Sequence, residues 1–120
     1  MKKDFLEINN KTMMFKLPLT EIIHIESEGM TTYVHTTSGD RHKCCKNIGA
    51  VEEELNGTKF LFRTHSSHII NLTTVKVYNK EDGNVEIANG RVVPVAKRRK
   101  PEFIKAYKNF LHSRTFPNFK

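Results

Sequence analysis

The chain has 120 residues, enough for one domain and too few for two domains with separate hydrophobic cores. Its 38% hydrophobic and 28% charged content is that of a folded globular protein and not of a disordered one. No apolar run approaches the roughly 20 residues that cross a bilayer, and the N-terminus lacks the apolar segment of a secretory signal, so we expect a cytoplasmic protein.

The positive charge is concentrated at the end of the chain. The formal net charge is +7, but residues 1–90 carry 11 Lys/Arg against 12 Asp/Glu, whereas residues 91–120 carry 9 Lys/Arg against the single Glu102. A block of this kind is typical of a face that binds a polyanion, because each cation placed at a phosphate releases condensed counterions. A basic tail that only improves solubility remains the alternative.

Two adjacent cysteines, Cys44 and Cys45, are the only ones in the chain. A disulfide between neighbours is strained, and a single vicinal pair is not the framework of a secreted domain. We expect both thiols to be reduced.

The first half of the chain predicts short strands followed by one short helix. Apolar and β-branched runs between turn-forming residues predict strands at 5–8, 13–17, 22–27, 31–37 and 41–45. Asn47 is a suitable N-cap and Asn56-Gly57 a suitable C-terminal stop for a helix between them. Glu52, Glu53 and Glu54 would occupy the solvent-exposed side of this helix.

The second half predicts more strands and a terminal helix. Strand character occurs at 60–62, 69–72, 74–78, 84–88 and 91–95, with a polar segment at 63–68. Asn89-Gly90 predicts a type I′ hairpin turn. Pro101 near the first turn and an apolar stripe from Phe103 to Leu111 predict the last helix. The fold class is therefore mainly β, multi-stranded and antiparallel, with one short internal helix and a C-terminal helix.

Three sequence blocks, in this order, carry a family resemblance. They are Ile22-Ile23-His24-Ile25-Glu26-Ser27, Phe62-Arg63-Thr64-His65-Ser66-Ser67-His68-Ile69-Ile70-Asn71, and Val93-Pro94-Val95-Ala96-Lys97-Arg98-Arg99. Together they resemble the LytTR domain, the DNA-binding output module of many bacterial response regulators. The middle block is the most specific of the three. The resemblance makes residues 1–120 a single LytTR-like domain with a core at about 5–111.

The resemblance implies an elongated, mostly β fold whose loops and strand ends enter successive major grooves of double-stranded DNA. By position, the base-contacting residues would be Met30, Thr31, Thr32, His65, Ser66 and Lys97. Residues near the DNA backbone would be Arg63, Ser67, Arg98 and Arg99. Lys97 or Arg98 could donate to guanine O6 and N7, and Thr32 could offer its methyl group to thymine.

The chain departs from the family pattern at a few positions. The family commonly has a basic residue where Ser66 stands, an Asn-Tyr pair where Met30-Thr31 stand, and a Ser where Ala96 stands. Loss of a cation at position 66 should change the preferred base and the strength of binding by that loop.

The resemblance also implies partners: duplex DNA with tandem half-sites, a homodimer on that DNA, and an upstream receiver domain in a full-length regulator. We expect no cofactor and no enzymatic activity. The alternative from a different class is a basic interaction module, in which the C-terminal segment docks an acidic protein or a membrane surface without regard to DNA sequence.

Several side chains have simpler interpretations. His65 and His68 could be a metal pair or the acid and base of a small hydrolase, but two histidines without a further ligand are a weak signal, so we expect no metal site. Asn71 is expected to cap the backbone, and His24 to be structural or solvent-facing. Arg63 is equally well explained as a buried ion-pair partner, for example of Glu26, or as a phosphate contact.

Overall fold

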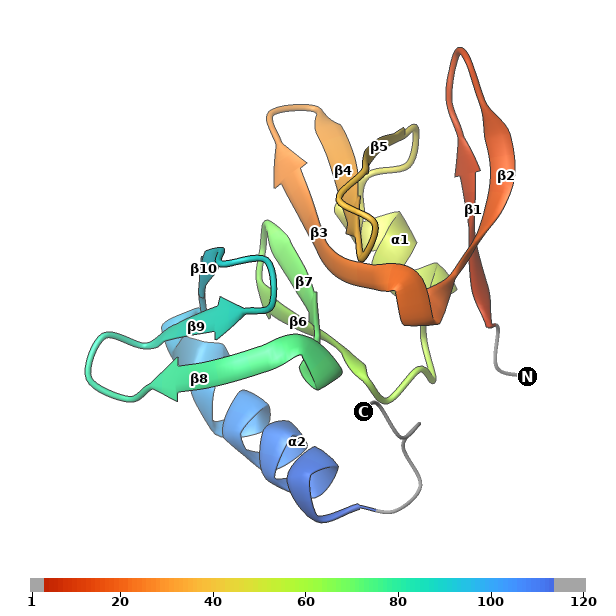
Figure 1. The fold of residues 1–120 in the computed structure, drawn as a ribbon. Helices are drawn as coiled ribbons and strands as arrows, with labels where there is room; N and C mark the ends of the chain where they lie inside the picture. Colours follow the sequence, from red (N-terminus) through yellow and green to blue (C-terminus); the bar gives the residue numbers. More distant parts are fainter. Residues whose placement is uncertain (1–3, 114–120) are drawn as a thin grey trace.

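The computed structural model describes residues 4–113, which form ten strands, two α-helices and three short 3₁₀ turns (Figure 1). The strands are β1 (Phe5–Asn9), β2 (Met14–Pro18), β3 (Ile22–Glu28), β4 (Thr31–Thr36), β5 (Arg41–Cys44), β6 (Leu61–His65), β7 (His68–Asn71), β8 (Val75–Asn79), β9 (Asn84–Ile87) and β10 (Val92–Pro94). The helices are α1 (Ile48–Glu54) and α2 (Lys100–His112). The predicted mainly β fold with two helices is thus confirmed.

All strand pairs are antiparallel and form three sheets. A five-stranded sheet has the order β5-β4-β3-β7-β6, and β1-β2 and β10-β9-β8 are smaller sheets. Strand β3 lies at the centre of the large sheet because its run Ile22–Ile25 is buried on both sides, which suits a strand covered on two faces.

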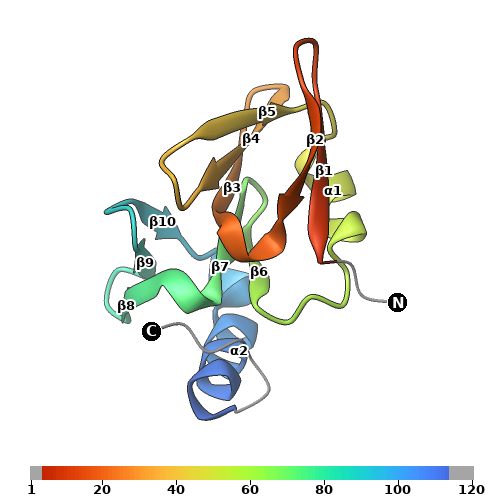
Figure 2. The same cartoon turned by 45° about the vertical axis from the view of Figure 1, so that its right-hand side comes forward.

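Two hydrophobic clusters cover opposite faces of the five-stranded sheet. Ile25 and Ile69 pack with β1, β2 and α1, whereas Ile23 and Ile70 pack with β8, β9, β10 and α2. The neighbours Ile69 and Ile70 enter different clusters because successive side chains of a strand point to opposite faces. Ile23 and Ile25 are two residues apart, and they enter different clusters because the register of β3 shifts between Ile22 and His24. Figures 1 and 2 show the resulting arrangement, with the β1-β2 hairpin and α1 on one side and the β8-β9-β10 sheet and α2 on the other.

The helices begin and end close to where the sequence predicts. The Asn47 side chain accepts a hydrogen bond from the Ala50 amide, as an N-cap does, and Pro101 lies in the first turn of α2. The buried side chain of Phe103 docks α2 onto the sheet. Its ring contacts Phe62 edge to face and lies tilted against the ring of Tyr78. No helix among residues 4–113 is long and apolar enough to span a bilayer.

Two local predictions were wrong. The Asn89-Gly90 turn is not type I′, because only Gly90 has a positive φ (82°) and the Gly90 amide donates to the carbonyl of Ile87. Glu54 is not solvent-exposed: its side chain is 9% exposed and pairs with Lys46.

Candidate nucleic-acid interface

The turn between β6 and β7 is held by the side chain of Arg63. The guanidinium donates from Nη2 to the carbonyl of Ser66 (2.7 Å) and from Nε to the carbonyl of His65 (3.2 Å). Its remaining nitrogen, Nη1, pairs with Glu52 Oε1 at 2.6 Å. The ion-pair partner is therefore Glu52 and not Glu26, and all three donating nitrogens are used inside the protein.

The same turn leaves Ser66 exposed. The ring of His65 faces back into the turn, where its Nδ1 accepts from the Ser67 amide at 3.1 Å. Ser66 is exposed, whereas His65 and Ser67 are half-buried. Of the predicted contacts in this turn, Ser66 is the best placed to meet another molecule.

The basic run after β10 lies beside β6. The Ala96 amide donates to the carbonyl of Thr64 (2.7 Å), and Arg99 Nη1 lies 3.4 Å from the carbonyl of Arg63. These contacts position the 3₁₀ turn Lys97–Arg99, in which Lys97 and Arg98 are exposed and Arg99 is half-buried. A segment some thirty residues away in sequence thus adjoins the β6-β7 turn.

The turn between β3 and β4 is the third neighbour. The Ser27 amide donates to the carbonyl of Ser67 (2.8 Å), which places the end of β3 next to the β6-β7 turn. Beyond it, Gly29 (φ +61°) reverses the chain, and the Met30 side chain is 100% exposed. Such a large apolar side chain in full contact with solvent is available to a partner.

Thr32 does not share this position. Its side chain is 1% exposed, and its Cα pairs with that of Cys44 on β5. The expectation that Thr32 offers its methyl group or hydroxyl to a base was wrong for this conformation, because alternation along β4 turns Thr32 inward while Thr31 is half-buried.

We call the exposed and half-buried residues of these three segments the turn surface: Met30 and Thr31, His65 to Ser67, and Lys97 to Arg99. Figure 1 shows the β6-β7 turn between β3 and β10. Two of the segments lie in the second and third sequence blocks and one directly follows the first block, so the fold brings together parts that are distant in the sequence.

A polar cluster lies at the base of the turn surface. On β3, Glu26 Oε2 is 2.5 Å from His35 Nε2 of β4, and Glu26 Oε1 is 2.8 Å from Arg91 Nη2. Burial alone would raise the pKa of Glu26, but the hydrogen bonds from His35 and Arg91 outweigh it, so the pKa lies below its ordinary value. Arg91 was absent from the predicted site, although its place in the basic last quarter of the chain was a signal.

Two further histidines adjoin Glu26. His24 is fully buried, its Nε2 lies 3.0 Å from His68 Nδ1, and the two rings stack. Burial, followed by the neighbouring His68, lowers the pKa of His24 to about 3, and burial lowers that of His68. His24 is thus neutral. The sequence predicts no metal site, but His24, Glu26 and His68 form a group of possible metal ligands among the described residues.

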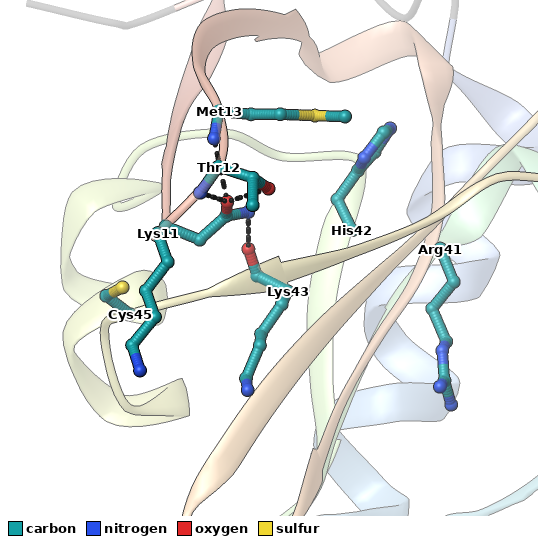
Figure 3. A pocket seen from close by; sticks show the side chains of 8 residues that line it. Lys11, Thr12, Met13, Arg41, His42, Lys43 and Cys45 are labelled. Atoms are coloured by element: carbon teal, nitrogen blue, oxygen red, sulfur yellow. Dashed lines mark hydrogen bonds between the residues drawn. The ribbon is translucent and has the colours of Figure 1, made fainter.

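A separate pocket of about 440 Å³ lies between the β1-β2 turn and β5. Figure 3 shows Lys11, Lys43 and Arg41 around it, together with Met13 and the exposed thiol of Cys45. The Asn10 amide fixes this turn by donating to the carbonyl of Lys43 at 2.8 Å. None of the predicted site residues lines this pocket.

Comparisons with known proteins agree on one family. A family model described as the LytTr DNA-binding domain matches residues 12–108. A solved structure, the LytTr DNA-binding domain of a protein described as a methyl-accepting/DNA response regulator from Bacillus cereus, is similar with a TM-score of 0.72 and 20% sequence identity over 87% of this chain and 96% of that one. At that identity the likeness shows the fold. No curated protein shows a significant match to the chain.

Proposed function

Because the chain belongs to the LytTR family of DNA-binding domains, we propose that its turn surface contacts base edges in successive major grooves of duplex DNA. The resemblance carried by the three sequence blocks is confirmed by the family match, and DNA binding follows from membership. Our proposal adds three points: the mode of contact, the specificity for a DNA sequence, and a role in regulating transcription.

The observation that carries the proposal is the adjacency of three exposed segments from distant parts of the chain. Two backbone hydrogen bonds, Ser27 to Ser67 (2.8 Å) and Ala96 to Thr64 (2.7 Å), join them. Loops and strand ends of this kind fit a major groove about 12 Å wide, where all four base pairs present different groups. A basic rim next to them supplies the phosphate contacts that position the protein.

The exposed residues divide by chemistry. Lys97 and Arg98 are exposed cations that can donate to guanine O6 and N7, and Ser66 can donate or accept. Met30, fully exposed, can pack on a thymine methyl group. Ser67 and Arg99 would lie near the DNA backbone. Arg63 and Thr32 are left out of this contact set, because Arg63 holds the turn and Thr32 is buried.

The absence of a cation at position 66 affects how much each of the three segments contributes to the free energy of DNA binding. The β6-β7 turn presents a neutral Ser66 with half-buried His65, so the electrostatic attraction falls to Lys97, Arg98 and Arg99. We therefore expect strong salt dependence from the segment after β10 and base preference from Ser66 and Met30. The full regulator would bind tandem half-sites as a dimer controlled by an upstream receiver domain.

The test is selection of duplexes from a random library, followed by titration of selected and scrambled duplexes at two salt concentrations. Specific binding should exceed nonspecific binding by about 10³-fold or more. Lys97→Ala should cost about 1–3 kcal/mol at particular bases, because an edge contact is lost. Binding would be measured by fluorescence anisotropy.

The matched control is Lys59→Ala. Lys59 is also an exposed lysine, but it precedes β6, at the end opposite the turn surface, so its removal should leave sequence preference unchanged. If the parent chain bound all duplexes with the same affinity, the proposal would be contradicted and a basic module that docks acidic partners would be favoured. If Lys97→Ala lost the same affinity on every duplex, Lys97 would contact phosphate and not a base.

A further inference from the structure

The antiparallel sheet places four polar side chains together beneath the turn surface. In the register of the sheet, His24 lies opposite His35 and Glu26 lies opposite His68, while His24 and Glu26 are two residues apart on β3. Directly opposite residues and residues two apart share one face of a sheet. The cluster therefore follows from strand register.

We propose that His24, Glu26 and His68 form a binding site for a divalent transition-metal ion of the zinc class. One ligand atom from each of the three residues lies within 4.8 Å of the other two. Two imidazoles and one carboxylate are a set that zinc uses in proteins where further coordination positions remain open. Soft thiolate ligands are not needed for this set.

The spacing of the two imidazoles already fits. His24 Nε2 and His68 Nδ1 are 3.0 Å apart. Two nitrogens that bind zinc at 2.0–2.1 Å with tetrahedral angles lie about 3.3 Å apart. In the metal-free protein one of these nitrogens donates a hydrogen bond to the other, and a bound metal ion would take the place of the shared proton.

The carboxylate can bind metal and keep its neighbours. Glu26 Oε2 contacts His35 and Oε1 contacts Arg91, and an ionised carboxylate has about four acceptor sites. His35 would then orient Glu26 from outside the coordination sphere, as a second-shell partner does. The positive charge of Arg91 would repel the metal ion. The carboxylate of Glu26, whose side chain is 12% exposed, supplies a negative charge that offsets this repulsion.

A bound ion would join β3 to the first residue of β7. His68 directly follows the β6-β7 turn, and the Ser27 amide already bonds the carbonyl of Ser67. The ion would thus fix the base of the turn surface in the folded chain. Because it binds the folded state only, it should raise the Tm, and the Tm should rise with the logarithm of the free ion concentration once that exceeds the Kd.

The experiment uses the full chain, stripped of metal by a chelator that is then removed. Co²⁺ is added while its visible absorption bands are recorded, and Zn²⁺ is then added in competition. We expect saturation at one equivalent, displacement by Zn²⁺, and a higher Tm with either ion. Glu26→Gln and His68→Gln should each weaken binding by more than about 100-fold, beyond the 10- to 100-fold that loss of an outer-sphere partner causes.

The matched control is His42→Gln, which removes a histidine from β5 that packs on Phe15 away from the cluster. This variant should bind Co²⁺ as the parent chain does. Thermal melting of each metal-free variant, followed by circular dichroism, tests whether the variant is folded. The two cluster variants remove different ligands, so the comparison with the parent chain needs only one of them to fold. Equal binding by the parent, a folded cluster variant and the control would overturn the site, as would the absence of saturable binding in the parent.

Discussion

At the scale of single residues, Arg63 shows how a cation in a DNA-binding motif can hold a turn in shape instead of contacting DNA. Its guanidinium reaches the carbonyls of His65 and Ser66, and its side chain is only 15% exposed. Arginine suits this position because its planar group presents several donors in fixed directions. The side chain therefore determines the shape of the β6-β7 turn that carries Ser66.

Replacement of Arg63 by Ala should lower the free energy of unfolding by about 1.5–3 kcal/mol, the range for hydrogen bonds that involve a charged group. It should also weaken DNA binding on all sequences alike, because the turn loses its fixed shape. Urea unfolding and anisotropy titration measure the two effects.

The control for this variant is Glu52→Gln, which removes only the ion pair. The Glu52 side chain is 48% exposed, so the cost should stay below about 1 kcal/mol. A Glu52→Gln variant as unstable as Arg63→Ala would show that the ion pair, and not the two carbonyl contacts, holds the turn.

At the scale of elements, Asn71 connects the two central strands to the following 3₁₀ turn. Its side chain is buried, donates from Nδ2 to the carbonyl of Ile22 (2.8 Å), and accepts at Oδ1 from the Thr73 amide (2.9 Å). The predicted backbone-capping role is thus confirmed, with the addition of a contact to β3. An amide side chain does both because it has a donor and an acceptor end.

We expect Asn71→Ala to lower the free energy of unfolding by about 2 kcal/mol or more, because each buried polar group left unpaired costs about 1–3 kcal/mol. Asn47→Ala is the matched control: it also removes a capping Asn, but an exposed one at the start of α1, and should cost about 1 kcal/mol. The two costs are compared by thermal and urea unfolding. The reverse order would contradict the role assigned to Asn71.

At the scale of the whole molecule, the five-stranded sheet supports both hydrophobic clusters and also fixes the turn surface. The molecule as a whole is moderately elongated, with extents of 41 × 31 × 26 Å. The β3-β4 turn and the β6-β7 turn are ends of strands in this sheet, and the segment after β10 joins it through the Ala96 to Thr64 hydrogen bond. The sheet therefore positions all three segments.

We expect a single turn surface to place one chain on one half-site. We expect the isolated chain to bind two half-sites about 10 bp apart and two half-sites about 15 bp apart equally well, without cooperativity. A chain fused to a dimerising segment should prefer the 10 bp spacing, which puts both half-sites on one face of the duplex. Footprinting of both duplexes measures this. Cooperative binding by the unfused chain would contradict the dependence on a separate dimerising domain.

The sequence by itself determined the elements and the family. The strands, both helices, the Asn47 cap and the three blocks could be predicted because they depend on local patterns: apolar alternation, turn residues and spacing along the chain. The exposed residues Met30, Ser66, Lys97 and Arg98 were among the predicted contacts for the same reason, since they lie in those blocks or directly after the first one.

Only the tertiary structure decided what each polar side chain contacts. Strand register placed His24, Glu26, His35 and His68 in one cluster. Packing of α1 and of the segment before β10 gave Arg63 the partner Glu52 and brought Arg91 to Glu26 across 65 residues of sequence. These contacts depend on how separate elements align and pack, and a pattern within one strand does not specify its neighbour's alignment.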